Sequence, residues 1–167
     1  MNHQPIQYTT EIRADIAQMK LLEEKFDVES MNSQDLHRIF FDSIKFIFTG
    51  KEFLEECNIS QEMDSKIHLY FAKIESYFNE NISDEELEFF AVEAWKEHDQ
   101  SDGIYKYILR TVICAMGSME ENVRNDRADF LLGFMFAFFR KFDEKYCEAF
   151  RKNIEQHPKM KKYQISR

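Results

Sequence analysis

The sequence predicts an all-α fold, a single compact domain of six or seven helices in an orthogonal or irregular bundle, on three observations. Apolar side chains recur every three or four residues along most of the chain, which is the spacing of amphipathic helices. Only 4 glycines and 2 prolines occur in 167 residues, too few for the many tight turns of a β-rich fold. The chain is 44% hydrophobic and holds 17 phenylalanines, which is ample material for one core.

Three helices are expected in the first half of the chain. The first covers Thr10–Glu29, where apolar residues repeat at helical spacing. Asn32 or Ser33 can cap the second, and Gly50 offers a left-handed stop after it. After a short apolar segment, Ser60 is expected to cap the third helix.

The second half predicts three further helical regions. Ser83 and Glu86 have the spacing of a capping box, which marks the start of the fourth helix. The break at residues 101–103 separates it from a helix that runs to Gly117. After a short turn, a long helical region is expected from Arg127 to Gln156.

The predicted domain organisation is simple. Residues 1–157 form the helical domain, and Pro158 ends its last helix. Residues 158–167 are rich in lysine and lack periodicity, which predicts a basic, flexible tail.

Three features indicate a cytoplasmic protein. Cys57, Cys114 and Cys147 are odd in number and far apart, so neither a disulfide framework nor a CxxC site is suggested. Residues 1–11 are polar and do not resemble a signal peptide. The apolar run from Phe130 to Phe139 is about half of the roughly 20 residues that span a bilayer, so no membrane segment is expected.

Charge is the most informative surface feature of the sequence. The net charge is -9, and residues 80–102 hold nine acidic residues against Lys96. The helix dipole explains the acids that follow Ser83, but not the later ones, which are Glu93, Glu97, Asp99 and Asp102. Such a run is either a solvated face or a docking surface for a basic protein, because negative charge steers cationic partners. Direct binding of nucleic acid is disfavoured, since phosphates would be repelled.

The sequence carries no motif for metal, cofactor or phosphate chemistry. Its five histidines include no HxxxH pair, and neither GxGxxG nor GxxxxGK[ST] occurs. Asp64 and His68 stand one helical turn apart, which is typical of a surface ion pair. We therefore expect a protein that is not an enzyme and binds neither metal nor cofactor.

One catalytic alternative stays open at the C-terminal end. Residues 151–157 fit the loose R-x4-6-H pattern and resemble the HEPN family of all-helical ribonucleases. This resemblance implies that Arg151 and His157 form a paired active site across a dimer and act on RNA. Lys152 departs from the polar residue that usually follows the arginine in that family.

Aromatic residues suggest where a partner would bind. Trp95, Tyr105 and Tyr107 lie in or beside the acidic run, and tyrosine and tryptophan are enriched at interface hot spots. The neighbouring rings of residues 40, 41, 46 and 48 cannot share one helix face, so either that helix is central or some rings are left for a partner, including a homodimer.

A family resemblance joins these observations. The stretch from Ala91 to Trp95, followed by Asp102 to Tyr107, is similar to the Trp-then-Tyr pattern of some helical immunity proteins, especially those of contact-dependent growth inhibition. The resemblance implies binding to a cognate toxin domain, often a basic nuclease. Four acids would then mimic substrate phosphates and three aromatics would supply contact area; they are Glu93, Glu97, Asp99, Asp102, Trp95, Tyr105 and Tyr107. A small-ligand-binding helical regulator is a further alternative.

Overall fold

The computed structural model of the chain describes residues 13–116 and 127–165, and within them it confirms the all-α prediction. Eight α-helices and two 3-10 helices follow one another in these residues. They are α1 (Ala14–Lys25), η1 (Val28–Ser30), α2 (Ser33–Phe48), α3 (Lys51–Glu56), α4 (Gln61–Phe78), α5 (Asp84–Gln100), α6 (Gly103–Ala115), α7 (Arg127–Phe142), α8 (Lys145–Gln156) and η2 (Pro158–Tyr163).

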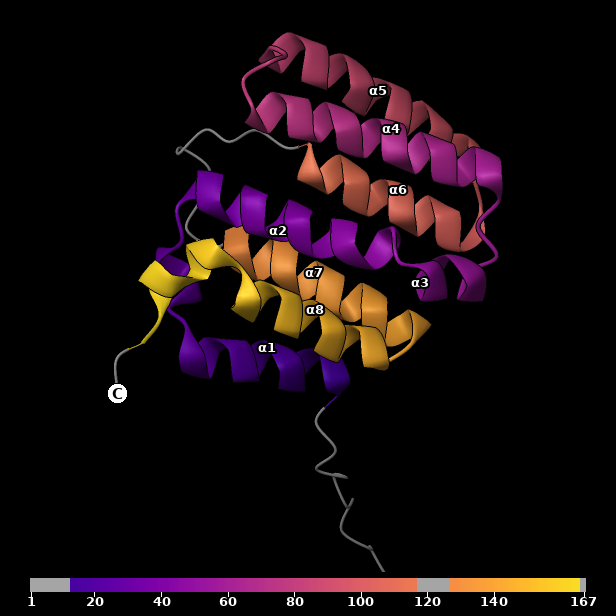
Figure 1. Cartoon of the computed structure of the whole chain (residues 1–167). Helices are drawn as coiled ribbons and strands as arrows, with labels where there is room; N and C mark the ends of the chain where they lie inside the picture. Colours follow the sequence, from indigo (N-terminus) through magenta and orange to yellow (C-terminus); the bar gives the residue numbers. More distant parts are fainter. Residues whose placement is uncertain (1–12, 117–126, 166–167) are drawn as a thin grey trace, which may run out of the picture.

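The helices form two layers that pack on each other (Figure 1). The upper layer consists of α4, α5 and α6, with α5 at its outer edge. The lower layer consists of α1, α2, α7 and α8, and α1 lies at the opposite edge of the molecule from α5. The α5 helix packs on α4 and α6, so one side of it has no neighbouring helix in the described chain.

Side-chain caps begin three helices where the sequence predicts them. The Asn32 side chain accepts a hydrogen bond from the amide of Asp35 at 2.8 Å. Ser60 and Ser83 each accept one, at 3.2 Å, from the amide three residues further on. Each cap satisfies a donor that the helix itself leaves free, so these starts are encoded locally.

The expectation for Gly50 is wrong. Its φ is -70°, and it begins α3 instead of adopting a left-handed stop. A Cβ at Gly50 would lie 3.1 Å from the carbonyl oxygen of Ile47, so the backbone at the end of α2 leaves little room for a side chain there. The described residues with positive φ are Asn58, Glu80 and Gly103.

The expected long helix at residues 127–156 is divided into α7 and α8. The break falls at Asp143, whose carboxylate accepts a hydrogen bond from the amide of Lys145 at 3.0 Å. This local bond offers the backbone an alternative to the helix, and the two helices then fold back against each other.

The expectation of a flexible tail is corrected for residues 158–165. Here η2 packs on the domain, and Met160 is fully buried. The Tyr163 hydroxyl donates to the carboxylate of Asp35 at 2.5 Å, and Lys162 pairs with the same carboxylate. A backbone bridge also joins Phe26 to Gln164. A buried apolar side chain, an aromatic hydroxyl and lysine ion pairs to Asp35 therefore order this segment together.

The core is rich in phenylalanine and lies mainly in the lower layer. Phe139 is fully buried and its ring meets the rings of Phe48, Phe53 and Phe150 at centroid distances of 6.0, 6.5 and 5.6 Å. Phe46 is the exception on α2, with 72% of its surface exposed. Helix α2 is therefore central on most of its circumference. No helix in the described ranges is long and apolar enough to cross a membrane.

Candidate functional site

Helix α5 exposes large apolar side chains to solvent. Leu87 and Ala94 are its fully buried residues, and they mark the side that faces the domain. Phe89 and Val92, which lie on the other side of the helix, expose 60% and 47% of their surface. Exposed apolar residues one turn apart on the side of a helix that no other helix covers form a small apolar patch.

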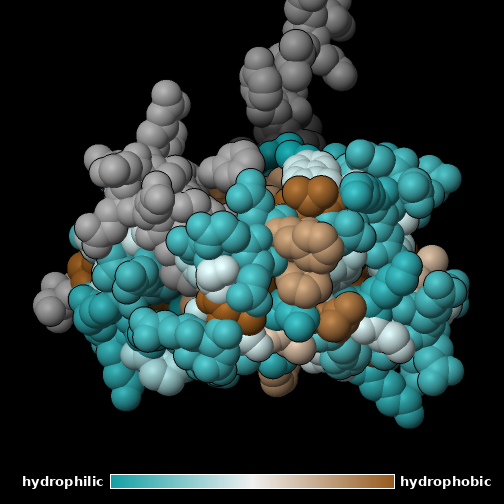
Figure 2. Space-filling model, turned by 90° about the horizontal axis from the view of Figure 1, so that it is seen from above, coloured by the Kyte–Doolittle hydropathy of each residue, from teal (hydrophilic) through white to brown (hydrophobic). Residues whose placement is uncertain are grey.

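Three carboxylates lie beside these two apolar residues, and the exposed Lys96, four residues after Val92, lies on the same side of the helix. Spacings of three and four residues place Glu85, Glu88 and Asp99 on the same side of α5, and all three are exposed. We call Glu85, Glu88, Phe89, Val92 and Asp99 the α5 face. Figure 2, which views the molecule from the side of α5, shows a band of apolar side chains bordered by hydrophilic ones. Leu69 on the neighbouring α4 is also half exposed and adds apolar surface to the upper layer.

Two of the sequence-predicted site residues face the domain instead. The Glu97 carboxylate accepts hydrogen bonds from the hydroxyls of Tyr105 and Tyr70 at 2.6 and 3.1 Å, and Lys66 pairs with it at 2.9 Å. Tyr105 is 4% exposed. We call Lys66, Tyr70, Glu97 and Tyr105 the Glu97 cluster. It joins α4, α5 and α6, so Glu97 and Tyr105 hold the upper layer together and offer little surface to a partner.

The Glu97 cluster shifts the protonation of its members. Burial alone would raise the pKa of the Glu97 carboxyl, but the hydrogen bonds from Tyr105, Lys66 and Tyr70 lower it below the ordinary value. Burial, followed by the bond to Glu97, raises the pKa of both tyrosines. The carboxylate therefore stays ionised and the hydroxyls stay protonated over the neutral range, as an acceptor with three donors requires.

The remaining predicted residues are distributed around α5 and α6. Trp95 lies on the side of α5 toward α6, where the Arg110 guanidinium sits 4.8 Å from its ring, and it is 36% exposed. Glu93 pairs with Lys96 at 3.3 Å and stays partly accessible. Asp102 caps α6 without a side-chain hydrogen bond, while Tyr107 is 53% exposed next to α7. Together with Asp99, these accessible residues remain candidates for partner contact.

Phe89 and Val92 were not predicted as site residues from the sequence. They follow a buried leucine by two and five positions, which places them away from the Leu87–Ala94 side of a helix. This spacing could have predicted from the sequence that both residues lie on the outer side of the helix. Their exposure, however, depends on which sides of α5 are covered by α4 and α6, and this is a property of the fold.

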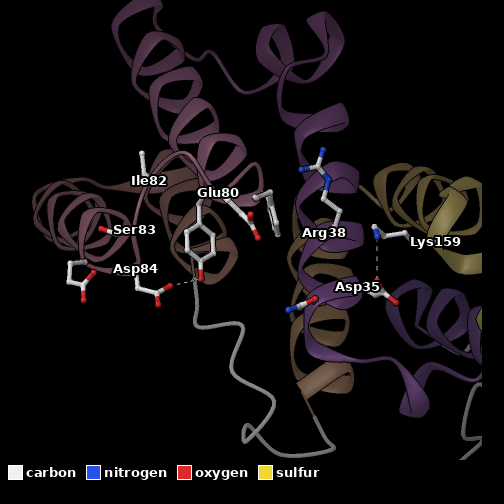
Figure 3. A pocket seen from close by; sticks show the side chains of 11 residues that line it. Asp35, Arg38, Glu80, Ile82, Ser83, Asp84 and Lys159 are labelled. Atoms are coloured by element: carbon white, nitrogen blue, oxygen red, sulfur yellow. Dashed lines mark hydrogen bonds and ion pairs between the residues drawn. The ribbon is translucent and has the colours of Figure 1, made fainter.

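A polar pocket of about 660 Å³ opens at the start of α5, between α2 and the α4–α5 turn (Figure 3). Its charges are mostly paired: Arg38 binds Asp42 and Glu75 at 3.1 and 2.8 Å, and Asp35 pairs with Lys159 at 3.5 Å. The Asp84 carboxylate accepts from the Tyr77 hydroxyl at 2.5 Å.

Two carboxylates in this pocket extend the acidic surface of α5. Glu80 and Glu85 line it and are exposed, and Figure 3 shows Glu80 directed toward its interior. Glu85 also belongs to the α5 face. The pocket thus adds a place at the end of that face where a cationic side chain can lie between carboxylates.

The two residues of the ribonuclease alternative are engaged within the chain. The Arg151 guanidinium donates to the side-chain oxygen of Gln18 at 2.5 Å and pairs with Glu155 at 2.8 Å. His157 accepts from the amide of Lys159 on Nδ1 and donates from Nε2 to Asp42 at 2.7 Å. Both side chains thus fasten α8 and η2 to the domain, and no contact between them supports a shared catalytic role.

Neither metal nor homology provides a further clue to function. Among the described residues, no group of three or more His, Cys, Asp or Glu side chains could hold a metal ion. Comparisons with protein-family models, with curated proteins and with solved structures found no match. The geometry of α5 and its surroundings is therefore the basis for a functional proposal.

Proposed function

We propose that this chain is a cytoplasmic binding protein that neutralises a cognate toxin domain, a basic nuclease, as immunity proteins do. The observation that carries the proposal is the exposure of Phe89 and Val92 among carboxylates on the outermost helix. An apolar centre with a charged rim is the anatomy of a specific protein interface.

The two kinds of side chain on the α5 face would act at different stages of binding. Its carboxylates attract a basic surface over a distance of about 10 Å at moderate salt and so raise the association rate. Phe89 and Val92 lose contact with water only in the docked complex, so they slow dissociation. The Glu97 cluster keeps α5 in place while its outer side remains free.

The proposal is tested by co-expression with the protein encoded directly upstream. That protein should be toxic alone and harmless beside this chain, and the two should copurify in equal amounts. Replacing Phe89 and Val92 together by alanine should abolish protection, because it removes the apolar centre of the interface.

A matched control distinguishes the α5 face from surface apolarity in general. Phe46→Ala removes an even more exposed ring from α2, and Leu21→Ala removes an exposed side chain from α1. Both variants should protect fully. Loss of protection in the controls, or its persistence in the α5 double variant, would show that α5 is not the binding face.

A further inference from the structure

A second cavity lies away from the α5 face, between the start of α6 and the last half of α7. Its volume is about 370 Å³, within the range of small-molecule sites. The walls are apolar and largely aromatic; they are formed by Ile104, Tyr107, Phe134, Ala137, Phe138 and Phe142. The rings of Tyr107 and Phe138 stand 6.2 Å apart, so a flat or chain-like apolar group would meet an aromatic wall.

The polar groups of the cavity favour an anion. Of the described residues that line it, Lys141 alone is charged, and no ion pair to another described residue occupies its ammonium group. Gly103 also lines the cavity as the first residue of α6, and the space beside its Cα is open to 4 Å. The Asp102 side chain does not cap this helix. The first amides of α6 therefore lack a side-chain acceptor next to an accessible backbone.

We propose that this cavity binds a small monocarboxylate with an apolar body. The body would lie against the aromatic walls, where burial of apolar surface supplies most of the affinity. The carboxylate would accept from Lys141 and from the first amides of α6, which together give the cavity one positive end. The site is separate from the α5 face, so ligand binding can be measured without any protein partner.

The carboxylate of Asp102 opposes the binding of an anion, so its removal tests whether the ligand's negative charge is recognised. Asp102 precedes Gly103 and is exposed, so its carboxylate reduces the positive potential at the start of α6. Neutralising Asp102 should therefore strengthen the binding of an anion, whereas neutralising Lys141 should weaken it. A ligand recognised only by its apolar body would respond to neither change.

The experiment is calorimetric titration of the full chain with octanoate and, as the uncharged match, octanol. Octanoate should bind more tightly than octanol. Lys141→Gln should weaken octanoate binding about three- to fivefold, the effect of one partly exposed ion pair. Asp102→Asn should strengthen it about twofold, and octanol binding should not change in either variant.

Two further variants complete the design. Ala137→Trp fills the cavity from a partly exposed position and should remove binding of both ligands, with thermal unfolding used to check that it remains folded. Lys20→Gln removes an exposed charge from α1 and should change nothing. Absence of octanoate binding at millimolar concentration, or equal affinities for octanoate and octanol that ignore Lys141 and Asp102, would overturn the proposal.

Discussion

The lower layer is built around packed aromatic rings, whereas the outer helix of the upper layer is attached to its neighbours partly through polar contacts. In the lower layer, aromatic rings pack around the fully buried Phe139 in edge-to-face and tilted contacts. In the upper layer, α5 buries only Leu87 and Ala94 completely, and the Glu97 cluster adds a polar connection to both neighbours. Phe90 and Ala91 of α5 are partly buried against the core, whereas Phe89 and Val92 are turned to the outside.

This difference separates residues that build the fold from residues that are free to bind. A buried ring such as Phe139 cannot be removed without leaving a cavity, while the exposed ring of Phe89 can be removed without one. The upper layer thus presents its outer helix as a platform whose exposed side chains are not needed for folding. Matched substitutions in the two layers test this separation.

The largest effect is expected for Phe139→Ala. The variant removes a fully buried ring that contacts several others, so the free energy of unfolding should fall by about 3–5 kcal/mol. Phe89→Ala should change it by less than about 0.5 kcal/mol. Urea denaturation of both variants measures the contrast. Similar losses in the two would mean that α5 is part of the core and not a platform.

A smaller loss is expected for Glu97→Ala. The variant leaves the hydroxyls of Tyr70 and Tyr105 and the ammonium of Lys66 without their shared acceptor, which should cost about 2–3 kcal/mol. Glu93→Ala on the adjacent accessible position should cost almost nothing. Equal stability of the two variants would show that the Glu97 cluster does not secure α5.

The pH dependence of stability gives a second readout of the same variant. The pKa of Glu97 is lower in the folded chain than its ordinary value of 4.5, so its contribution is present above pH 4.5 and is lost as the pH falls through the folded value. The stability difference between wild type and Glu97→Ala should therefore shrink below pH 4.5. An unchanged difference would contradict an ionised acceptor.

The smallest effect is expected at the C-terminal segment, which joins the lower layer. Tyr163→Phe removes the hydrogen bond that the hydroxyl donates to Asp35 and the one that it accepts from the amide of Asn32. It leaves Lys162 and the packing of Met160, so it should cost about 1 kcal/mol. Tyr107→Phe, which alters an exposed ring, is the control. Thermal unfolding compares them. No difference would mean that Tyr163 is ordered by packing alone.

Three helix starts that depend on short-range chemistry were predictable from the sequence. Asn32, Ser60 and Ser83 cap their helices because a side-chain oxygen reaches an amide three residues away, and this requires no knowledge of the fold. The break at Asp143 was missed, since neither glycine nor proline marks it. The order of residues 158–165 was missed because it depends on Asp35, more than 120 residues earlier in the chain.

At the candidate site, too, the features that depend on contacts between distant parts of the chain were not predictable from the sequence. The acidic run predicted the helix that carries the site, but not which of its carboxylates are free. Glu97 and Asp99 are two positions apart and lie on different sides of α5, and the placement of α4 and α6 covers the first and leaves the second accessible. Tyr105 and Tyr107 differ in the same way on α6, where one is buried and the other is half exposed.

The central claim is that the outer side of α5 binds a basic partner, and dissociation kinetics test it most directly. With the upstream-encoded protein immobilised, the double variant Phe89→Ala and Val92→Ala should dissociate at least about tenfold faster than wild type, while Phe46→Ala should not. Unchanged dissociation of the double variant, or an equal increase for Phe46→Ala, would contradict the claim.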